Sequence, residues 1–151
     1  MLDLPPGTGD VQLTLCQTVP LAGSVIVTTP QSIALSDVRK AVAMFKKLNV
    51  PILGAIENMS GFICPHCSKE SKIFSEGSAA SLKKTFGIDM FGGIPLDPKG
   101  CQAAEDGKPI VLSHPDSIPA KALREVARKV AAAVSMRNAV ARPLEIKLVK
   151  A

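Results

Sequence analysis

The amino-acid sequence predicts an α/β fold built on a doubly wound, mostly parallel sheet. Short β-branched apolar runs alternate along the chain with stretches of helical periodicity, which is the order of elements in a right-handed parallel sheet covered by helices. The sequence contains five Phe and neither Trp nor Tyr, so its core must consist of Val, Ile, Leu and Ala. Since 46% of the 151 residues are hydrophobic, we expect a single core.

The expected elements follow in a regular order. The run SVIVTT is continuous and β-branched, which suits a strand that is buried on both faces. In the next segment Val38, Val42 and Phe45 share one helical face, and basic residues occupy the opposite face. The expected strands are 24–29, 51–58 and 88–95, and the expected helices are 32–50, 76–87 and 118–137, the last being the longest.

We expect a single domain over residues 1–137, followed by a tail over 138–151 that the sequence does not allow us to place. The amino terminus MLDLPPG has the pattern of the last residues of a buried strand, because two leucines flank Asp3 just before a Pro-Pro-Gly turn. A domain rarely begins at the end of a core strand. We therefore expect an incomplete, N-terminally truncated domain, with at least one βα unit missing upstream.

The charge and hydropathy patterns argue against two classes of partner. The net charge is +5, but the basic residues are dispersed over the polar sides of expected helices, and no aromatic residues are interleaved with them. We therefore expect no nucleic-acid partner. No apolar run is long enough to span a bilayer, and the amino terminus lacks the regions of a signal peptide, so we expect no membrane partner.

The segment DLPPGTGD, residues 3–10, is the first candidate site. Gly7 and Gly9 would let the backbone approach a ligand closely. Asp3, at the end of a core strand, suits a water-mediated contact with Mg²⁺ in a nucleotide site. The segment is not a phosphate-binding loop of the form G-x-x-x-x-G-K-(S/T), and this pattern occurs nowhere in the chain. Alone, the segment is at least as typical of an ordinary tight turn.

Several motifs together resemble a known family. The chain contains, in order, PPGTGD, VTTPQSIALSD, ENMS, CPHC, GIPLD and GKPIVLSHPDS. Their order and spacing resemble the Mrp-like (ApbC-type) P-loop ATPases, which carry and assemble iron–sulfur clusters. The resemblance covers roughly residues 2–135 and implies a sheet of the P-loop NTPase, Rossmann-like type.

The resemblance also implies roles for individual residues, with ATP and Mg²⁺ as cofactors of the family. Asp3 would lie near Mg²⁺ and the γ-phosphate as the catalytic residue, and Gly7 to Asp10 would form a switch loop. Asn58, at the end of its strand, would recognise the base. Pro95 and Asp97 would line the base pocket, and Cys64 and Cys67 would bind the cluster.

The chain departs from the family at one place. The family's Walker A segment, with its lysines and its Mg²⁺-binding Ser or Thr, lies upstream of PPGTGD and is absent from this sequence. Without backbone amides and a lysine to neutralise the phosphates, most of the affinity for ATP is lost. We therefore expect the 151-residue chain to be a poor ATPase by itself.

The cysteines form the second candidate site. Four cysteines without a secretory signal indicate a reducing compartment, where a C-x-x-C pair is more often metal-binding or redox-active than a structural disulfide. Thiolates favour iron–sulfur clusters, and a cubane cluster usually has four of them. Cys16 and Cys101 are expected to be buried or incidental. A second copy of the chain would complete the set, so we predict a homodimer that bridges a [4Fe–4S] cluster and passes it to apo iron–sulfur proteins.

Other interpretations stay open. Four thiolates from two chains would also bind Zn²⁺, and C-P-H-C also occurs in thiol–disulfide exchange, although no apolar helical stripe follows these cysteines. The loop could carry free thiols without any ligand. In a different class, the chain would be an ATPase-dead interaction module that pairs with a full-length paralogue. We expect a cytoplasmic location, or a mitochondrial or plastid one if a transit peptide precedes Met1.

Overall fold

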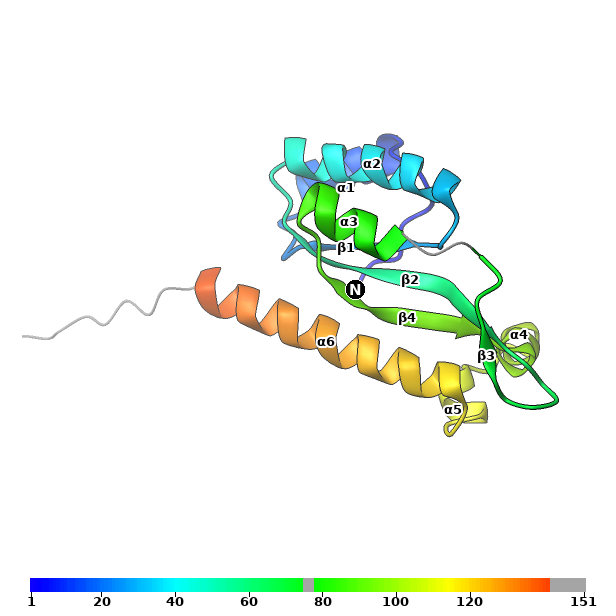
Figure 1. Cartoon of the computed structure of the whole chain (residues 1–151). Coiled ribbons are helices and arrows are strands. Elements are labelled where there is room, and N and C mark those ends of the chain that lie inside the picture. The colour runs from blue at the N-terminus through cyan, green and yellow to red at the C-terminus, as the bar shows by residue number, and fades with distance from the viewer. Residues whose placement is uncertain (75–77, 142–151) are drawn as a thin grey trace, which may run out of the picture.

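A computed structural model of the chain describes residues 1–74 and 78–141 (Figure 1). The strands in this part of the chain are β1 (Ser24–Thr28), β2 (Ile52–Ile63), β3 (Glu70–Ser71) and β4 (Met90–Leu96). The helices are α1 (Asp10–Thr18), α2 (Ser32–Lys47), α3 (Ser78–Phe86), α4 (Pro98–Glu105), α5 (Ile110–Ser113) and α6 (Ile118–Ala141).

The central strand of the sheet is β2. β1 lies parallel to its first half, and β4 lies parallel to it on the other side. β3 is antiparallel to the last residues of β2. Phe62 of β2 has Ser71 of β3 as one partner and Leu96 of β4 as another, so β3 and β4 flank β2 on opposite sides. The three longer strands are parallel, which confirms the predicted α/β sheet.

Helices cover both faces of the sheet, with α1, α2 and α3 on one face and α6 on the other (Figure 1). The main core lies between the sheet and the first three helices, and Leu82 and Val42 are its largest fully buried side chains, with 0% and 1% of their surface exposed. On the other face, Lys129 of α6 donates a hydrogen bond of 2.7 Å from Nζ to the carbonyl oxygen of Phe91 in β4.

The helices on the core face follow the sequence pattern closely. Val38, Val42 and Phe45 of α2 are buried, as their spacing predicts. Asn49, just after this helix, has a left-handed backbone with φ of +56°. α3 ends at Phe86 and is followed by Gly87, whose φ is +68° and whose N–H donates to the carbonyl of Lys83 at 3.0 Å. Both ends are C-terminal caps that need a residue tolerant of positive φ.

Several elements differ from the sequence expectations. β2 continues to Ile63, beyond the predicted end at Asn58. Its extension is held by pairing with β3 and β4. The sequence analysis also did not predict β3, α4 and α5. α4 begins at Pro98, and the side chain of Asp97 caps it. α6 continues to Ala141, into the segment predicted as a tail, and residues 142–151 lie outside the described residues.

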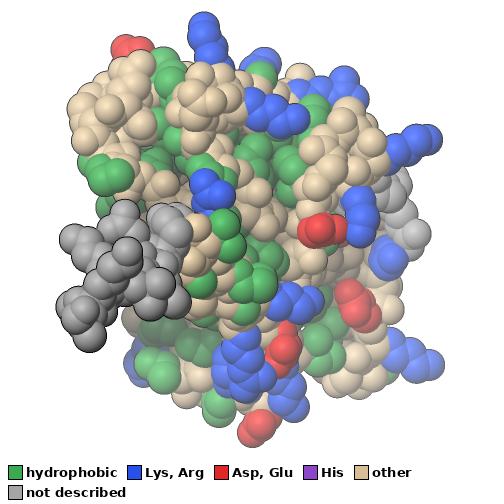
Figure 2. Space-filling model, turned by 90° about the vertical axis from the view of Figure 1, so that its left-hand side faces the viewer, with side chains coloured by type: hydrophobic (Ala, Val, Ile, Leu, Met, Phe, Trp, Pro, Cys, Tyr) green, Lys and Arg blue, Asp and Glu red, His purple; other side chains and the backbone are tan. Residues whose placement is uncertain are grey.

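The face of the molecule away from β3 is shown in Figure 2, where Lys and Arg side chains lie around a central area of hydrophobic side chains. Two helices end with lysines, Lys46 and Lys47 in α2 and Lys83 and Lys84 in α3. A positive charge in the last turn is favourable beside the negative end of the helix dipole. No helix in residues 1–74 and 78–141 is long and apolar enough to cross a bilayer.

Candidate functional site

The two predicted cluster ligands lie in the turn between β2 and β3. The N–H of Cys64 donates to the carbonyl of Lys69 at 3.0 Å, and the N–H of Ser68 donates to the carbonyl of Cys64 at 2.8 Å. Ser68 has a φ of +55°, so the backbone turns sharply directly after Cys67. The segment Cys64–Ser71, together with the end of β2, is called the cysteine hairpin below.

The thiols of the cysteine hairpin are free and accessible. Cys67 is exposed and Cys64 is half-buried. The backbone N–H groups of His66 and then of Cys67, together with the Cys67 thiol, hydrogen-bond to Cys64 and lower the pKa of its thiol. Donors aimed at one sulfur favour its thiolate, which is the form that binds metal.

One chain offers two sulfur donors at this place and no more. Within residues 1–74 and 78–141, no group of three or more His, Cys, Asp or Glu side chains is arranged to hold a metal ion. Cys16 lies on α1, where it packs against the core, as expected of a buried cysteine. Cys101 is exposed on α4. The cysteine hairpin therefore fits half of a four-thiolate shell.

Three of the predicted nucleotide residues lie close together in the sheet: Asn58 on β2, Pro95 on β4 and Asp97 directly after β4. Asn58 is exposed and pairs with Ile94, so it lies next to Pro95, which is buried. Asn58 does not end its strand, although the pairing of β2 with β1 ends one residue earlier, at Glu57. Its Oδ1 accepts a hydrogen bond of 3.0 Å from the N–H of Met59.

Asp97 has a local structural role in addition to the predicted one. It is the N-cap of α4, and its Oδ1 accepts a hydrogen bond of 2.8 Å from the N–H of Lys99. It also lines two neighbouring pockets of about 430 and 360 Å³. A contact between Asp97 and a nucleotide base stays a prediction.

The other predicted nucleotide residues lie at the amino terminus. Asp3 and Gly7 are exposed in a segment without regular structure, and Asp10 is the first residue of α1. Gly7 has a φ of +98°, a conformation that favours glycine. The sequence reading missed Gln12, which is 4% exposed and donates from Nε2 to the carbonyl of Pro5 at 2.7 Å. This bond fixes the glycine segment to α1.

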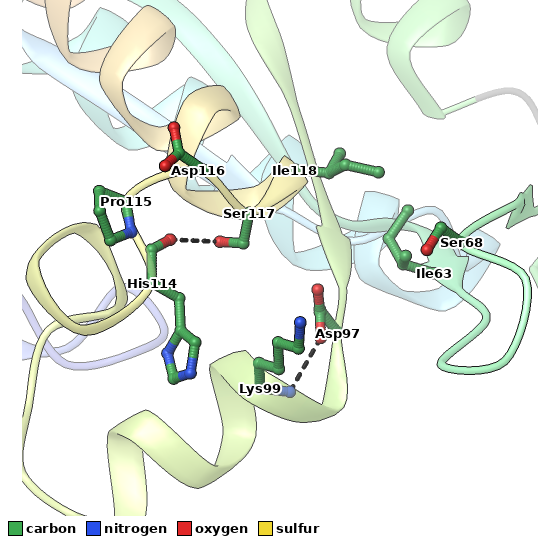
Figure 3. Close-up of a pocket in the computed structure, with 9 residues that line it drawn as sticks. All are labelled: Ile63, Ser68, Asp97, Lys99, His114, Pro115, Asp116, Ser117 and Ile118. Atoms are coloured by element: carbon green, nitrogen blue, oxygen red, sulfur yellow. Dashed lines mark hydrogen bonds between the residues drawn. The ribbon is translucent and has the colours of Figure 1, made fainter.

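A pocket that the sequence reading did not predict lies beside the cysteine hairpin (Figure 3). It includes Lys99 at the start of α4 and His114 in the α5–α6 connection. The sequence analysis gives His114 no role. The one available signal was the motif GKPIVLSHPDS, and that motif does not indicate what His114 would face.

Comparison with known proteins gives consistent results. Residues 1–131 match the family model described as the NUBPL iron-transfer P-loop NTPase of the ParA group. The iron–sulfur cluster carrier protein of Aquifex aeolicus is 49% identical over 137 residues, which are 91% of this chain and 38% of that protein. The iron–sulfur cluster transfer protein NUBPL of Mus musculus is 46% identical over 130 residues, 86% of this chain and 41% of that protein. This chain thus spans about two fifths of these relatives.

Solved structures agree with the fold. A nucleotide-binding protein of Archaeoglobus fulgidus, solved in complex with ADP, is 38% identical, with a TM-score of 0.60 over 70% of this chain and 43% of that chain. The septum site-determining protein MinD of Pyrococcus horikoshii has a TM-score of 0.60 over 77% of this chain and 44% of that chain. At 23% identity, the second match concerns the fold alone.

Proposed function

Because this chain belongs to the NUBPL-type, Mrp-like family of iron-transfer P-loop NTPases, we propose that it carries a [4Fe–4S] cluster as cargo and passes it to apo iron–sulfur proteins. Cys64 and Cys67 from each of two copies supply the four thiolates. The cluster lies between the two copies in a homodimer, and its transfer requires only that recipient thiolates replace those of the carrier.

The observation that carries this proposal is the state of the two thiols. They lie at an accessible turn, the pKa of Cys64 is lowered by backbone N–H donors, and no third ligand joins them within the described residues. A two-fold axis through the cluster would give both copies the same environment. A cluster bound between two accessible turns is transferred to a recipient protein more easily than a cluster buried in a core.

The same proposal includes the predicted nucleotide-binding residues, as parts of a longer protein like the relatives of this chain. Asp3, the loop from Gly7 to Asp10, and the group of Asn58, Pro95 and Asp97 would bind ATP with Mg²⁺ and couple its hydrolysis to loading or release. Support comes from the position of Asn58 beside Pro95 in the sheet and from the fixed glycine segment. The relatives are more than twice as long as their match to this chain, so the activity of the whole protein is part of this proposal.

Anaerobic reconstitution with iron and sulfide tests the cargo. We expect broad visible absorbance from the wild-type chain and its loss in Cys64→Ala and in Cys67→Ala. Cys101→Ala is the matched control, because Cys101 is also an exposed free thiol but lies on α4, and it should load normally. Equal loading of all four proteins would contradict the assignment of Cys64 and Cys67.

The rival interpretations give different results in the same experiment. A zinc protein would stay colourless, and its thiols would be protected from alkylation only while zinc is present. An interaction module without cargo would stay colourless with freely reactive thiols. Either result would contradict the iron–sulfur proposal.

A further inference from the structure

The pocket beside the cysteine hairpin has a volume of about 430 Å³, which is in the range of sites for small molecules. Three segments that are distant in the sequence form it (Figure 3). They are the two ends of the cysteine turn, the start of α4, and the connection between α5 and α6. The lining residues are Ile63, Ser68, Asp97, Lys99 and 114–118.

The pocket is adjacent to both cysteines along the chain. Ile63 directly precedes Cys64, and Ser68 directly follows Cys67. A molecule in the pocket therefore lies against both ends of the turn that carries the two thiols. Ile63 is 5% exposed and adds an apolar surface to the wall of the pocket.

The polar groups of the pocket suit a ligand with both charges. In the part of the chain that the structure describes, the Lys99 ammonium forms no ion pair, and His114 uses Nδ1 with the hydroxyl of Ser113 at 3.1 Å, which leaves its Nε2 available. Asp97 accepts the Lys99 N–H with Oδ1, so Oδ2 is available. Figure 3 shows Lys99 and His114 between α4 and the α5–α6 connection, and Asp116 directed away.

We propose that this pocket binds a small zwitterionic thiol of the size of a cysteine-containing tripeptide. Its carboxylate would bind Lys99 and His114, its ammonium would bind Asp97, and its thiol would face the cysteine hairpin. The proposal rests on the function proposed above. A single chain is two thiolates short of a complete shell, and a thiol in this pocket supplies one of the two missing sulfur donors when the two copies separate.

The test is a titration of the metal-free 151-residue chain with reduced glutathione, followed by two-dimensional NMR of its backbone amides. We expect saturable shifts at Ser68, at Lys99 and in the segment 114–118. S-methylglutathione should cause the same shifts, because the charged groups and not the thiol hold the ligand in the pocket. The absence of saturable shifts at these residues would overturn the proposal.

Matched variants test the charged contacts. We expect Lys99→Met to weaken glutathione binding about tenfold, since hydrogen bonds to charged groups contribute this much. Lys84→Met is the control, because Lys84 is also exposed but lies on α3, which contributes no residue to the pocket lining, and this variant should bind glutathione as the wild type does. Equal affinity of Lys99→Met and wild type would overturn the proposal.

The failure of this inference can be distinguished from the failure of the proposed function. The Cys64→Ala chain should lose cluster uptake but keep glutathione binding, because the pocket lining does not include Cys64. A chain that loads a cluster as a dimer but gives no glutathione shifts would contradict the pocket assignment alone.

Discussion

Cys64 is the residue whose chemistry depends most directly on its local backbone. The N–H of His66 is the largest cause of its lowered pKa, followed by the N–H of Cys67. Because of its lowered pKa, the thiolate predominates down to a lower pH than in an ordinary cysteine. Protons then compete less with a metal for the sulfur.

The lowered pKa of Cys64 predicts how its alkylation depends on pH, and two variants of His66 test whether the backbone N–H is the cause. Alkylation of Cys64 by iodoacetamide, followed by peptide mass spectrometry, should rise at a lower pH than for a free cysteine. His66→Pro removes the N–H donor and should move the profile to higher pH. His66→Ala keeps the donor and should leave the profile in place. If both variants gave the wild-type profile, the backbone would not be the cause.

Alanine substitutions at Leu82 and at Ile33 test the described core, because they compare a buried position with an exposed one. Leu82 is completely buried, whereas Ile33 on α2 is 80% exposed. We expect Leu82→Ala to lower the free energy of unfolding by about 2 to 5 kcal/mol, because it leaves a cavity beneath α3. Ile33→Ala should change it by less than about 0.5 kcal/mol. Urea unfolding curves measure both values, and similar losses in the two variants would contradict the described core.

At the scale of elements, β2 consists of two regularly paired parts with an irregular segment between them. Its first half is paired with β1 up to Glu57, and its end is paired with β3 from Phe62. Between them, Met59 has a φ of +58°, and the register with β4 shifts between Asn58 and Phe62. The strand therefore connects the predicted base-binding residue to the cysteine hairpin through an irregular segment.

The cysteine hairpin itself depends on a left-handed residue, Ser68. Ser68→Gly should retain cluster uptake, since glycine adopts a φ of +55° without strain. Ser68→Val should destabilise the turn by about 1 to 2 kcal/mol, because a β-branched side chain clashes with the backbone in this conformation. Cluster loading and urea unfolding of both variants measure this difference. Equal behaviour of the two variants would show that the turn does not need positive φ.

The sequence pattern made α2, α3 and α6 predictable, together with nearly all of β1 and β4 and the first half of β2. For α2, the helical spacing of Val38, Val42 and Phe45 was enough to predict the helix. The end of β2 could not be predicted, because the sequence Asn-Met-Ser-Gly is typical of a turn and only pairing with distant residues makes it a strand. The start of α4 was predictable, because Asp97 followed by Pro98 is a helix start signal.

At the scale of the whole molecule, the two candidate sites differ in how far the sequence reveals them. The cysteine pair is visible because both ligands lie within one turn. The pocket that contains Lys99 and His114 is not visible, because three segments far apart in the sequence form it. The positions of Asn58 and Pro95 side by side follow from strand register, which the sequence does not define.

The chain as printed should not turn over ATP by itself. It contains no G-x-x-x-x-G-K-(S/T) loop, and therefore no such set of amides with a lysine to stabilise the transferring phosphoryl group. A phosphate-release assay with ATP and Mg²⁺ should give no more product than buffer alone. Robust hydrolysis would show that other residues of the chain provide this stabilisation.

The most direct test of the central claim is the mass of the loaded species. Native mass spectrometry of the anaerobically reconstituted chain should show two chains with one [4Fe–4S] cluster, and Cys64→Ala should give cluster-free chains only. A loaded species that contains one chain and one cluster with no further ligand, or a chain that takes up no iron and sulfide, would contradict the account.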